Sequence, residues 1–370
     1  MSVARRRVVV LPGDGIGPEV TTEAVRCLSL ISGHYDFDLE FEEQSIGGAA
    51  IDVVGDPLPG ATLDACRRAD AILLGAVGGP SWDNIERRPE KALLELRSTL
   101  QLSANLRPIR VTKGLEHLST LKPEIVSGVD VLIVRELIGG IYFGEHRLSD
   151  GEAFDECSYT AAQIETVARV AFEAARTRSR RVTSFDKANV LATSRLWRSV
   201  VTAVSEDYPD VGLEHMLVDA AAMALIKEPG GFDVILTENL FGDILSDEAS
   251  VMCGSIGLLG SSSESADGPG LFEPIHGSAP ELAGKDVANP AGAIASAAML
   301  LERGLGLRHA ASQLDEALHR VLADGKRTAD LGGDLSCSQF GAAVRSELER
   351  QFASDRSYRN MFRSDRGICA

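Results

Sequence analysis

The chain has 370 residues, 44% of them apolar, and a formal net charge of −17 with a pI near 4.9. This length accommodates about two domains with cores of their own. The acidic balance argues against a nucleic-acid binder, which needs basic side chains for phosphate contacts, and no apolar run approaches the length of a membrane-spanning helix. We expect a cytoplasmic protein, without a signal peptide, that handles small molecules.

Apolar runs typical of short buried strands alternate with amphipathic helical patterns along most of the chain. The expected strands are 8–11, 71–74, 131–134, 181–185 and 234–236, and the expected helices are 18–32, 161–176, 195–205, 291–301 and 314–323. Thr160 and Gln163 form a capping box at the start of the helix over 161–176. The alternation predicts an α/β sheet with helices on both faces.

Three segments interrupt this alternation. Residues 139–159 combine glycines with aromatic residues, which predicts an extended hairpin or arm. The serine-rich patch 261–265 is expected to be a mobile loop, and 355–370, rich in Arg and Ser, a loosely attached tail. Six scattered cysteines without a C-x-x-C pair indicate reduced thiols, and neither a disulfide framework nor a zinc site.

A glycine-rich loop, LPGDGIGPE over 11–19, connects the first expected strand to the first expected helix. It is close to the dinucleotide-binding fingerprint G-x-G-x-x-G, but Pro18 holds the position of the third glycine. The sequence therefore predicts a tight turn beside a ligand and does not support a Rossmann fold.

Arg97, Arg107 and Arg135 lie near the ends of expected helices and strands. Guanidinium groups bind carboxylates through two parallel hydrogen bonds, so three that converged would hold a di- or tricarboxylate. Arginines in such places are also common surface residues. Their separation along the sequence leaves both interpretations open.

Lys187 and Asp219 are two further candidates. Lys187 follows the expected strand 181–185; a partly buried lysine near a metal ion can have a lowered pKa and act as a general base. The alternative is a lysine that extends to solvent from a sheet edge. Asp219 begins an apolar helix, where it fits either a metal ligand or a helix N-cap.

Asp243 and Asp247 stand four residues apart in TENLFGDILSDEAS (237–250), after an apolar strand. On a helix they project from one face, where two like charges repel unless a cation lies between them. Carboxylate oxygens suit Mg²⁺ or Mn²⁺. The alternative is a solvated acidic face, but the apolar flanks favour a cleft.

The segment 271–290 is rich in turn residues and carries polar side chains at intervals. Backbone amides in such a loop can hold phosphates, and an acidic side chain can bind ribose hydroxyls. The segment is therefore a candidate cofactor-binding loop.

Together these segments resemble the isocitrate/isopropylmalate dehydrogenase family of β-decarboxylating dehydrogenases. The resemblance covers about residues 5–350 and rests on blocks in one order: GDGIGPEV, LRSTLQLSANLRP, VRELIGGIYFGE, DKANVL, YPDVGLEHMLVDAAAM, TENLFGDILSDEAS, FEPIHGSAPELAGK and TADLGG. It implies an α/β/α two-domain fold that is not a Rossmann fold. The first domain would be discontinuous, over 1–101 and 255–370, and the second, over 102–254, would carry the arm and a dimer interface.

The same resemblance implies roles for the candidate residues. It assigns the malate carboxylates to Arg97, Arg107 and Arg135, and a Mg²⁺ or Mn²⁺ ion to Asp219, Asp243 and Asp247. Lys187 would accept the proton of the substrate hydroxyl, and Tyr142 would protonate the enolate on carbon. Lys187 and Asp219, which would also contact the substrate, would come from the partner subunit of a homodimer with shared active sites.

Substrate choice in this family lies in the segment before the first arginine. Leu93 and Leu94, with Val190 of the partner subunit, would form an apolar pocket for an isopropyl group, and Glu90 would repel a third carboxylate. This implies oxidative decarboxylation of 3-isopropylmalate to 4-methyl-2-oxopentanoate and CO₂, a step of leucine biosynthesis. The alternatives are a dehydrogenase of D-malate, tartrate or other 3-alkylmalates, and a non-catalytic relative that binds dicarboxylates.

Glu281 stands where NAD-dependent members carry an acid that binds the ribose hydroxyls and disfavours the 2′-phosphate of NADP. NAD is therefore the expected cofactor. The other residues assigned to it are Ile16, Glu273, His276, Gly277, Ser278, Ala279 and Asn289. The chain departs from the family at Glu281, which is usually Asp, and at Gly260, where many members have Pro.

Overall fold

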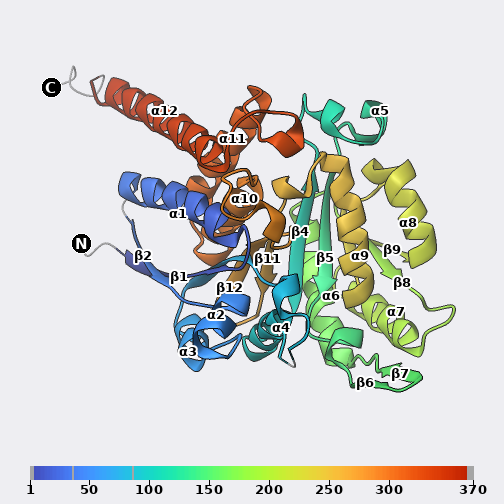
Figure 1. Cartoon of the computed structure of the whole chain (residues 1–370). Helices are drawn as coiled ribbons and strands as arrows, with labels where there is room; N and C mark the ends of the chain where they lie inside the picture. Colours follow the sequence, from blue (N-terminus) through green and yellow to red (C-terminus); the bar gives the residue numbers. More distant parts are fainter. Residues whose placement is uncertain (1–3, 36, 86, 365–370) are drawn as a thin grey trace.

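The structure, a computed structural model, describes residues 4–35, 37–85 and 87–364, with side chains up to residue 354. Ten of its strands form one sheet in the order β2-β1-β3-β12-β11-β4-β5-β10-β8-β9 (Figure 1). These strands are β1 Ala4–Gly13, β2 Phe37–Glu43, β3 Ala71–Ala76, β4 Ala104–Arg110, β5 Asp130–Glu136, β8 Arg181–Asp186, β9 Gly212–Leu217, β10 Val234–Thr237, β11 Gly260–Glu264 and β12 Gly270–Pro274. β11 is antiparallel to both neighbours and β4 is antiparallel to β5, whereas the other pairs are parallel.

Helices cover both faces of this sheet. They are α1 Gly17–His34, α2 Gly47–Val54, α3 Gly60–Arg67, α4 Pro89–Thr99, α5 Pro123–Val126, α6 Ala161–Arg176, α7 Ala192–Ser205, α8 Val218–Lys227, α9 Asn239–Ser250, α10 Ala291–Met299, α11 Arg308–Ala323 and α12 Cys337–Ser364. In β1, Val8 and Val10 pack with α1, α10, α11 and α12, whereas Val9 and Leu11 pack with α3 and α4. In β5 the two faces pack with α6 and α7 and with α8 and α9. Successive strand residues point to opposite faces, so strands covered on both sides are apolar throughout.

The expected strands and helices are all present, with boundaries shifted by a few residues. The capping box is confirmed, because the Thr160 side chain accepts from the Gln163 backbone and the Gln163 side chain accepts from the Thr160 backbone. One helix ends earlier than expected: α10 stops at Met299 and a π-helical turn, Leu300–Gly304, follows. α1 and α12, from opposite ends of the chain, lie side by side (Figure 1).

The expected arm over 139–159 is a short helix, η3 Gly140–Phe143, followed by a two-stranded hairpin of β6 His146–Ser149 and β7 Glu152–Asp155. Its apolar side chains face outward: Leu148 is 87% exposed and Phe154 43%. The hairpin stands clear of the main sheet and forms a separate ribbon (Figure 1).

The prediction of a mobile serine loop at 261–265 is wrong. Ser261, Ser262 and Ser263 are buried in β11, inside the main sheet. Their hydroxyls are satisfied locally, since Ser261 donates to the Glu273 carbonyl and Ser263 accepts from Asn105. Small polar side chains therefore suit this crowded strand, which composition alone did not reveal.

Two other features of the sequence have a structural explanation. Gly260 begins β11, and a Cβ there would lie 2.6 Å from the backbone nitrogen of Ser296 in α10, so only glycine fits without a shift. The expected tail is helical in its first part, because α12 continues through Ser364. The rest of that predicted tail, 365–370, lies outside the described residues.

The sheet is continuous across the predicted domain boundary, because β11 forms hydrogen bonds with β4. Strands β2, β1, β3, β12 and β11 come from 1–101 and 255–370, and the other five come from 102–254. The division into two domains stays a prediction. None of the helices in the described ranges combines the length and apolar character needed to cross a bilayer.

Candidate active site

α9 presents the aspartate pair on one face, toward arginines from two strands of the sheet. Arg107 of β4 lies between the two acids: its NH1 is 3.3 Å from Asp247 Oδ1 and its NH2 is 3.5 Å from Asp243 Oδ1. Arg135 of β5 donates to Asp243 as well. In this chain, therefore, arginine side chains supply the positive charge that the paired carboxylates require.

Burial and charge act against each other in this cluster. Burial lowers the pKa of Arg135 to about 10, with repulsion by Arg107 adding to the effect. Burial raises the pKa of Asp243, but the charges of Arg135 and Arg107 outweigh it and leave the pKa below its usual value. Burial also raises the pKa of Asp247, and there the attraction of Arg107 does not overcome it. The arginines therefore favour the ionised form of Asp243, whereas at Asp247 they offset less of the cost of burying the charge.

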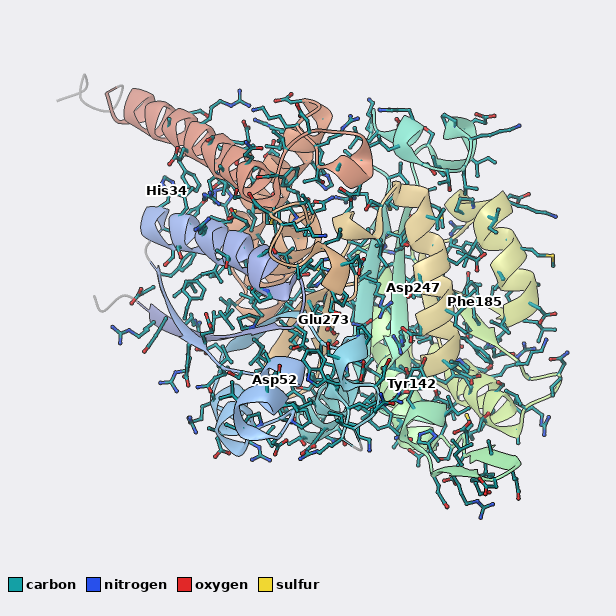
Figure 2. All side chains as sticks on the ribbon, viewed as in Figure 1. His34, Asp52, Tyr142, Phe185, Asp247 and Glu273 are labelled. Carbon is teal, nitrogen blue, oxygen red and sulfur yellow. The ribbon has the colours of Figure 1, made fainter. Side chains whose placement is uncertain are left out.

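Tyr142 is carried by η3 and joins the same cluster. Its hydroxyl donates to Asp243 Oδ2 at 2.8 Å, and the Arg135 guanidinium lies 5.7 Å from its ring centre. Burial, then the Asp243 charge, raise the pKa of Tyr142 to about 12. The phenol thus keeps its proton at neutral pH and can act as an acid. In Figure 2 Asp247 is labelled on α9, and Tyr142 is labelled near one end of the same helix.

Arg97, from α4, extends the positive group. Its NH2 donates to Glu273 Oε1 of β12 at 2.9 Å, and both side chains are nearly buried. Its Nε is buried and has no hydrogen-bond partner among the described residues. A buried donor left unpaired is costly, so this atom is available to an anionic ligand. The structure thus brings the three predicted arginines together from α4, β4 and β5.

Lys187 and Asp219 form a second, separate group. Lys187 follows β8, Asp219 lies in the first turn of α8, and Lys187 Nζ is 2.5 Å from Asp219 Oδ1. Leu217 holds the N-cap position of α8, so Asp219 is a residue of the first turn and not the N-cap. The Lys187 hydrogen bond lowers the pKa of Asp219. In the described part of the chain, neither residue has a hydrogen bond or ion pair with Asp243 or Asp247.

The segment before Arg97 forms α4, and its helical spacing orders the predicted specificity residues. Glu90, Leu94 and Arg97 are separated by four and three residues, so they lie in one row on the helix. Leu93 packs partly against the core beneath α4, whereas Leu94 does not belong to that core. Leu94 is therefore the apolar side chain that lies about one helical turn from Arg97. Val190, on the turn after β8, is 62% exposed and lies free on the surface of this chain.

The glycine-rich loop and the candidate cofactor loop are in direct contact. The Ile16 backbone nitrogen donates to the Ser278 carbonyl at 2.8 Å. Gly15 has a φ of +59°, and a Cβ there would lie 1.9 Å from the same carbonyl. This close approach explains the glycine without a dinucleotide fingerprint. Gly277 is exposed and Ala279 adopts a φ of 37°, which forms a sharp bend before Glu281.

The remaining cofactor candidates differ in what they offer. His276 is buried, its Nε2 has no partner among the described residues, and burial lowers its pKa. Glu281 is exposed on η7 Pro280–Leu282. The Asn289 amide is already engaged: its oxygen caps the Ala291 nitrogen and its nitrogen donates to Asp330. Each amide atom of Asn289 thus already makes one hydrogen bond within the chain.

Sequence reasoning overlooked two buried asparagines that hold the arginines. Asn105 accepts from Arg107 Nε at 2.7 Å, and Asn239 accepts from Arg135 Nε at 3.0 Å. It also overlooked Asp14, whose carboxylate accepts three backbone N–H groups, from residues 48, 49 and 78. Both asparagines lie inside conspicuous motifs, but no spacing rule connects them to arginines distant in sequence.

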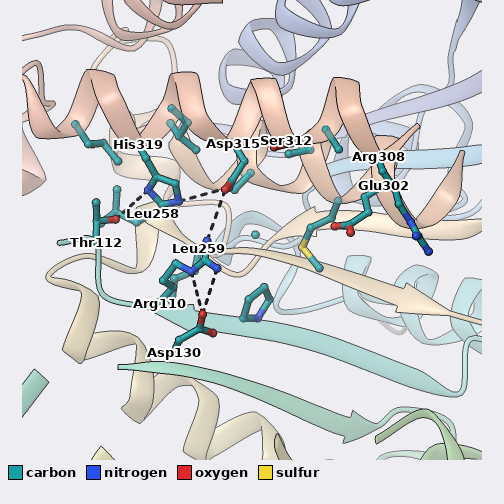
Figure 3. A pocket seen from close by; sticks show the side chains of 18 of the residues that line it. Arg110, Thr112, Asp130, Leu258, Leu259, Glu302, Arg308, Ser312, Asp315 and His319 are labelled. Atoms are coloured by element: carbon teal, nitrogen blue, oxygen red, sulfur yellow. Dashed lines mark hydrogen bonds and ion pairs between the residues drawn. The ribbon is translucent and has the colours of Figure 1, made fainter. Parts of the chain in front are cut away.

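A cavity of about 380 Å³ lies elsewhere, between α11 and the strands β4 and β5. Its charged groups pair with one another: Arg110 contacts Asp130 and Asp315, and His319 contacts Asp315 and Thr112 (Figure 3). It contains none of the predicted site residues. These pairs join α11 to the strands on the far side of the predicted domain boundary.

Three arginines beside two aspartates and a phenol suit a dehydrogenase that acts on hydroxy dicarboxylates. The sequence profile of the family described as isocitrate/isopropylmalate dehydrogenase matches residues 7–344. The chain belongs to this family and has its α/β fold, which is not a Rossmann fold. It is 52% identical over 344 residues to the 3-isopropylmalate dehydrogenase of Listeria monocytogenes serotype 4b, covering 93% of this chain and 98% of the relative. It is 54% identical over 333 residues to the 3-isopropylmalate dehydrogenase of Halalkalibacterium halodurans, covering 88% and 92%. The crystal structure of isocitrate dehydrogenase from Methylococcus capsulatus matches with a TM-score of 0.84 at 33% identity, covering 93% and 99%.

Proposed function

We propose that the chain oxidises and decarboxylates 3-isopropylmalate with NAD, giving 4-methyl-2-oxopentanoate, CO₂ and NADH. The observation that carries the proposal is the row on α4, where Leu94 precedes Arg97 by about one helical turn. Arg97 in turn lies close enough to Arg107 and Arg135 for its charge to act on both. The arginines supply charge for two carboxylates. An apolar side chain next to them suits an alkyl group and penalises a third carboxylate, which would lose hydration without a partner.

The residues of the chain fit both the metal ion and the cofactor. Asp247 is half exposed, with 58% of its side chain accessible, and offers oxygen ligands that suit Mg²⁺ or Mn²⁺. The buried His276 Nε2, which has no partner in the described structure, and the backbone at 277–279 line the candidate NAD loop. When bound, NAD takes the hydride from the hydroxyl-bearing carbon, and the divalent ion polarises the adjacent oxygen.

The chain's own groups provide the proton transfers. Arg97, Arg107 and Arg135 fix the substrate carboxylates. Lys187 accepts the hydroxyl proton during oxidation, and the β-carboxylate leaves as CO₂. Tyr142, whose phenol is protonated at neutral pH, then protonates the enolate carbon.

The proposal includes a homodimer in which Lys187 and Asp219 serve the partner's site. Its support is that neither member of this pair has a hydrogen bond or ion pair with Asp243 or Asp247 in the described part of the chain. Large apolar side chains are also exposed on α8, α9 and the segments near them, as expected of a surface that another chain covers. These are Val190, Met223, Ile226, Ile244 and Val251. The five cysteines within the described residues are free and four of them are buried, which agrees with a reducing compartment and therefore with the cytoplasm.

A substrate panel tests the proposal. We expect NADH formation with 3-isopropylmalate that stops when EDTA is added and returns with Mg²⁺ or Mn²⁺. Turnover should be slower when D-malate or isocitrate replaces 3-isopropylmalate, and when NADP replaces NAD. Equal or faster turnover of D-malate or isocitrate would contradict the substrate assignment. Binding of these acids without any turnover would instead support the dicarboxylate-binding alternative.

A further inference from the structure

Asn239 connects two parts of the site. It is the first residue of α9 and is 1% exposed. Its Oδ1 accepts from Arg135 Nε at 3.0 Å and from Arg135 NH2 at 2.8 Å. Its Nδ2 donates to the Gly139 carbonyl at 3.0 Å. One amide therefore joins a substrate arginine to the residue that precedes η3, the turn carrying Tyr142.

An amide suits this place better than a carboxylate would. Its neutral oxygen orients the guanidinium through two hydrogen bonds but leaves the positive charge of Arg135 for an anionic substrate. Its nitrogen can donate to Gly139 at the same time, which a carboxylate cannot do. Among the side chains of this size, asparagine alone combines a neutral acceptor and a donor in this geometry.

The turn that carries Tyr142 is also fixed from its other side. The Gly139 nitrogen donates to Glu136 Oε2 at 3.0 Å. Gly140 has a φ of +74°, and a Cβ there would lie 2.4 Å from the Tyr159 hydroxyl. That hydroxyl accepts from the Asn239 backbone nitrogen at 2.9 Å. Asn239 thus binds the turn directly through its side chain, and through its backbone it holds Tyr159, which packs against Gly140 of the turn.

We infer that Asn239 is a positioning residue that fixes Arg135 and Tyr142 relative to each other. Both reach Asp243, the arginine through NH1 and the phenol at 2.8 Å. With Asn239 in place, the substrate carboxylate held by Arg135 and the proton held by Tyr142 keep a set separation. The inference rests on the proposed function for the roles of the arginine and the tyrosine.

The chain offers a matched control in Asn105. This buried asparagine accepts from Arg107 Nε at 2.7 Å, as Asn239 does from Arg135. Its nitrogen, however, donates to Ser262 and Ser263 of β11 and not to the Tyr142 turn. Asn105→Ala therefore releases a substrate arginine without loosening the tyrosine.

Kinetics separate the two variants. In Asn239→Ala we expect the KM for 3-isopropylmalate to rise about tenfold or more, because a charged side chain loses its acceptor. Since Tyr142 acts after hydride transfer, we also expect a burst of up to one NADH per site followed by slow turnover. Asn105→Ala should raise KM without a burst. The inference is overturned if Asn239→Ala shows no burst, or changes only KM as the control does.

Hydrogen exchange provides a readout that needs no substrate. The amides of residues 139–143 should exchange faster in Asn239→Ala than in Asn105→Ala or the unaltered protein. Asn239→Asp, which keeps an oxygen toward Arg135 but loses the donor to Gly139, should show the same change and serves if the alanine variant does not fold. If the unaltered protein does not turn over 3-isopropylmalate but Asn239→Ala still exchanges faster at residues 139–143, the proposed function is wrong and the positioning role of Asn239 stands. If the unaltered protein is active but exchange in Asn239→Ala is unchanged, the positioning role is wrong and the proposed function stands.

Discussion

Lys187 Nζ lies 2.5 Å from Asp219 Oδ1, and in the described residues neither side chain has a hydrogen bond or ion pair with the aspartates of α9. In the proposed mechanism Lys187 is the base and Asp219 a metal ligand, so a second chain would have to supply the arginine cluster that this pair does not contact. In a two-fold dimer each site would combine the cluster of one subunit with this pair from the other. The lack of contact between the two groups within one chain is therefore the structural reason to expect shared sites.

Mixing two inactive variants tests shared sites directly. Lys187→Met and Asp243→Asn should each be inactive alone, because every site lacks one residue. Co-refolded in equal amounts, half of the dimers are hybrids, and each hybrid regains one intact site if the sites are shared. We expect about a quarter of the original activity by random assortment. No recovery, with hybrid dimers shown by mass spectrometry, would place the whole site in one chain.

Glu238 should make the free energy of unfolding depend on pH. Burial raises the pKa of Glu238 to about 7, although the Ser194 hydroxyl bond opposes this. The folded state therefore holds the proton more tightly, so this stabilising contribution is complete below about pH 4.5 and is lost as the pH rises through about 7. Glu238→Gln should remove the loss, on the order of 1–3 kcal/mol. Urea unfolding at pH 5 and pH 8, at one protein concentration, measures it.

A matching control for Glu238 is available at the surface. Glu165, exposed on α6, replaced by Gln should leave the difference between the two pH values as it is in the unaltered protein. If Glu238→Gln loses as much stability between pH 5 and pH 8 as the unaltered chain, the carboxyl group does not titrate in this range.

Leu94 should control the choice between alkylmalates and malate. Leu94→Ala removes apolar contact with the isopropyl group, and a lost contact of this size is worth about 1–2 kcal/mol. We therefore expect the ratio of kcat/KM for 3-isopropylmalate over D-malate to fall about tenfold. Ser98→Ala, an exposed change on the same helix, should leave the ratio unaltered. A ratio insensitive to Leu94 would mean that the alkyl pocket lies elsewhere.

Glu281 should determine the cofactor preference. Glu281→Lys replaces a charge that repels a 2′-phosphate with one that attracts it, so NADP should gain and NAD should lose kcat/KM. Glu281→Asp keeps the charge and should keep the preference for NAD. Steady-state rates with both cofactors decide this. An unchanged preference in Glu281→Lys would remove Glu281 from the ribose site.

Local sequence signals determined much of the fold. The helix over 161–176 was predicted with its capping box, because periodicity and capping are properties of neighbouring residues. The same holds for the hairpin over 139–159. The serine-rich strand β11 was not predicted as a strand, because its burial depends on Asn105, Glu273 and α10, which are distant in sequence.

The sequence by itself determined the candidates for the chemistry: three arginines, a tyrosine, a lysine and three aspartates in motifs of the family. Only the tertiary structure decided which of them meet. Arg107 and Arg135 converge on Asp243 because β4 and β5 are neighbours under α9, whereas Lys187 and Asp219 follow β8 and β9 at the sheet edge. Contacts between side chains depend on strand order and helix placement, and those result from packing of the whole chain.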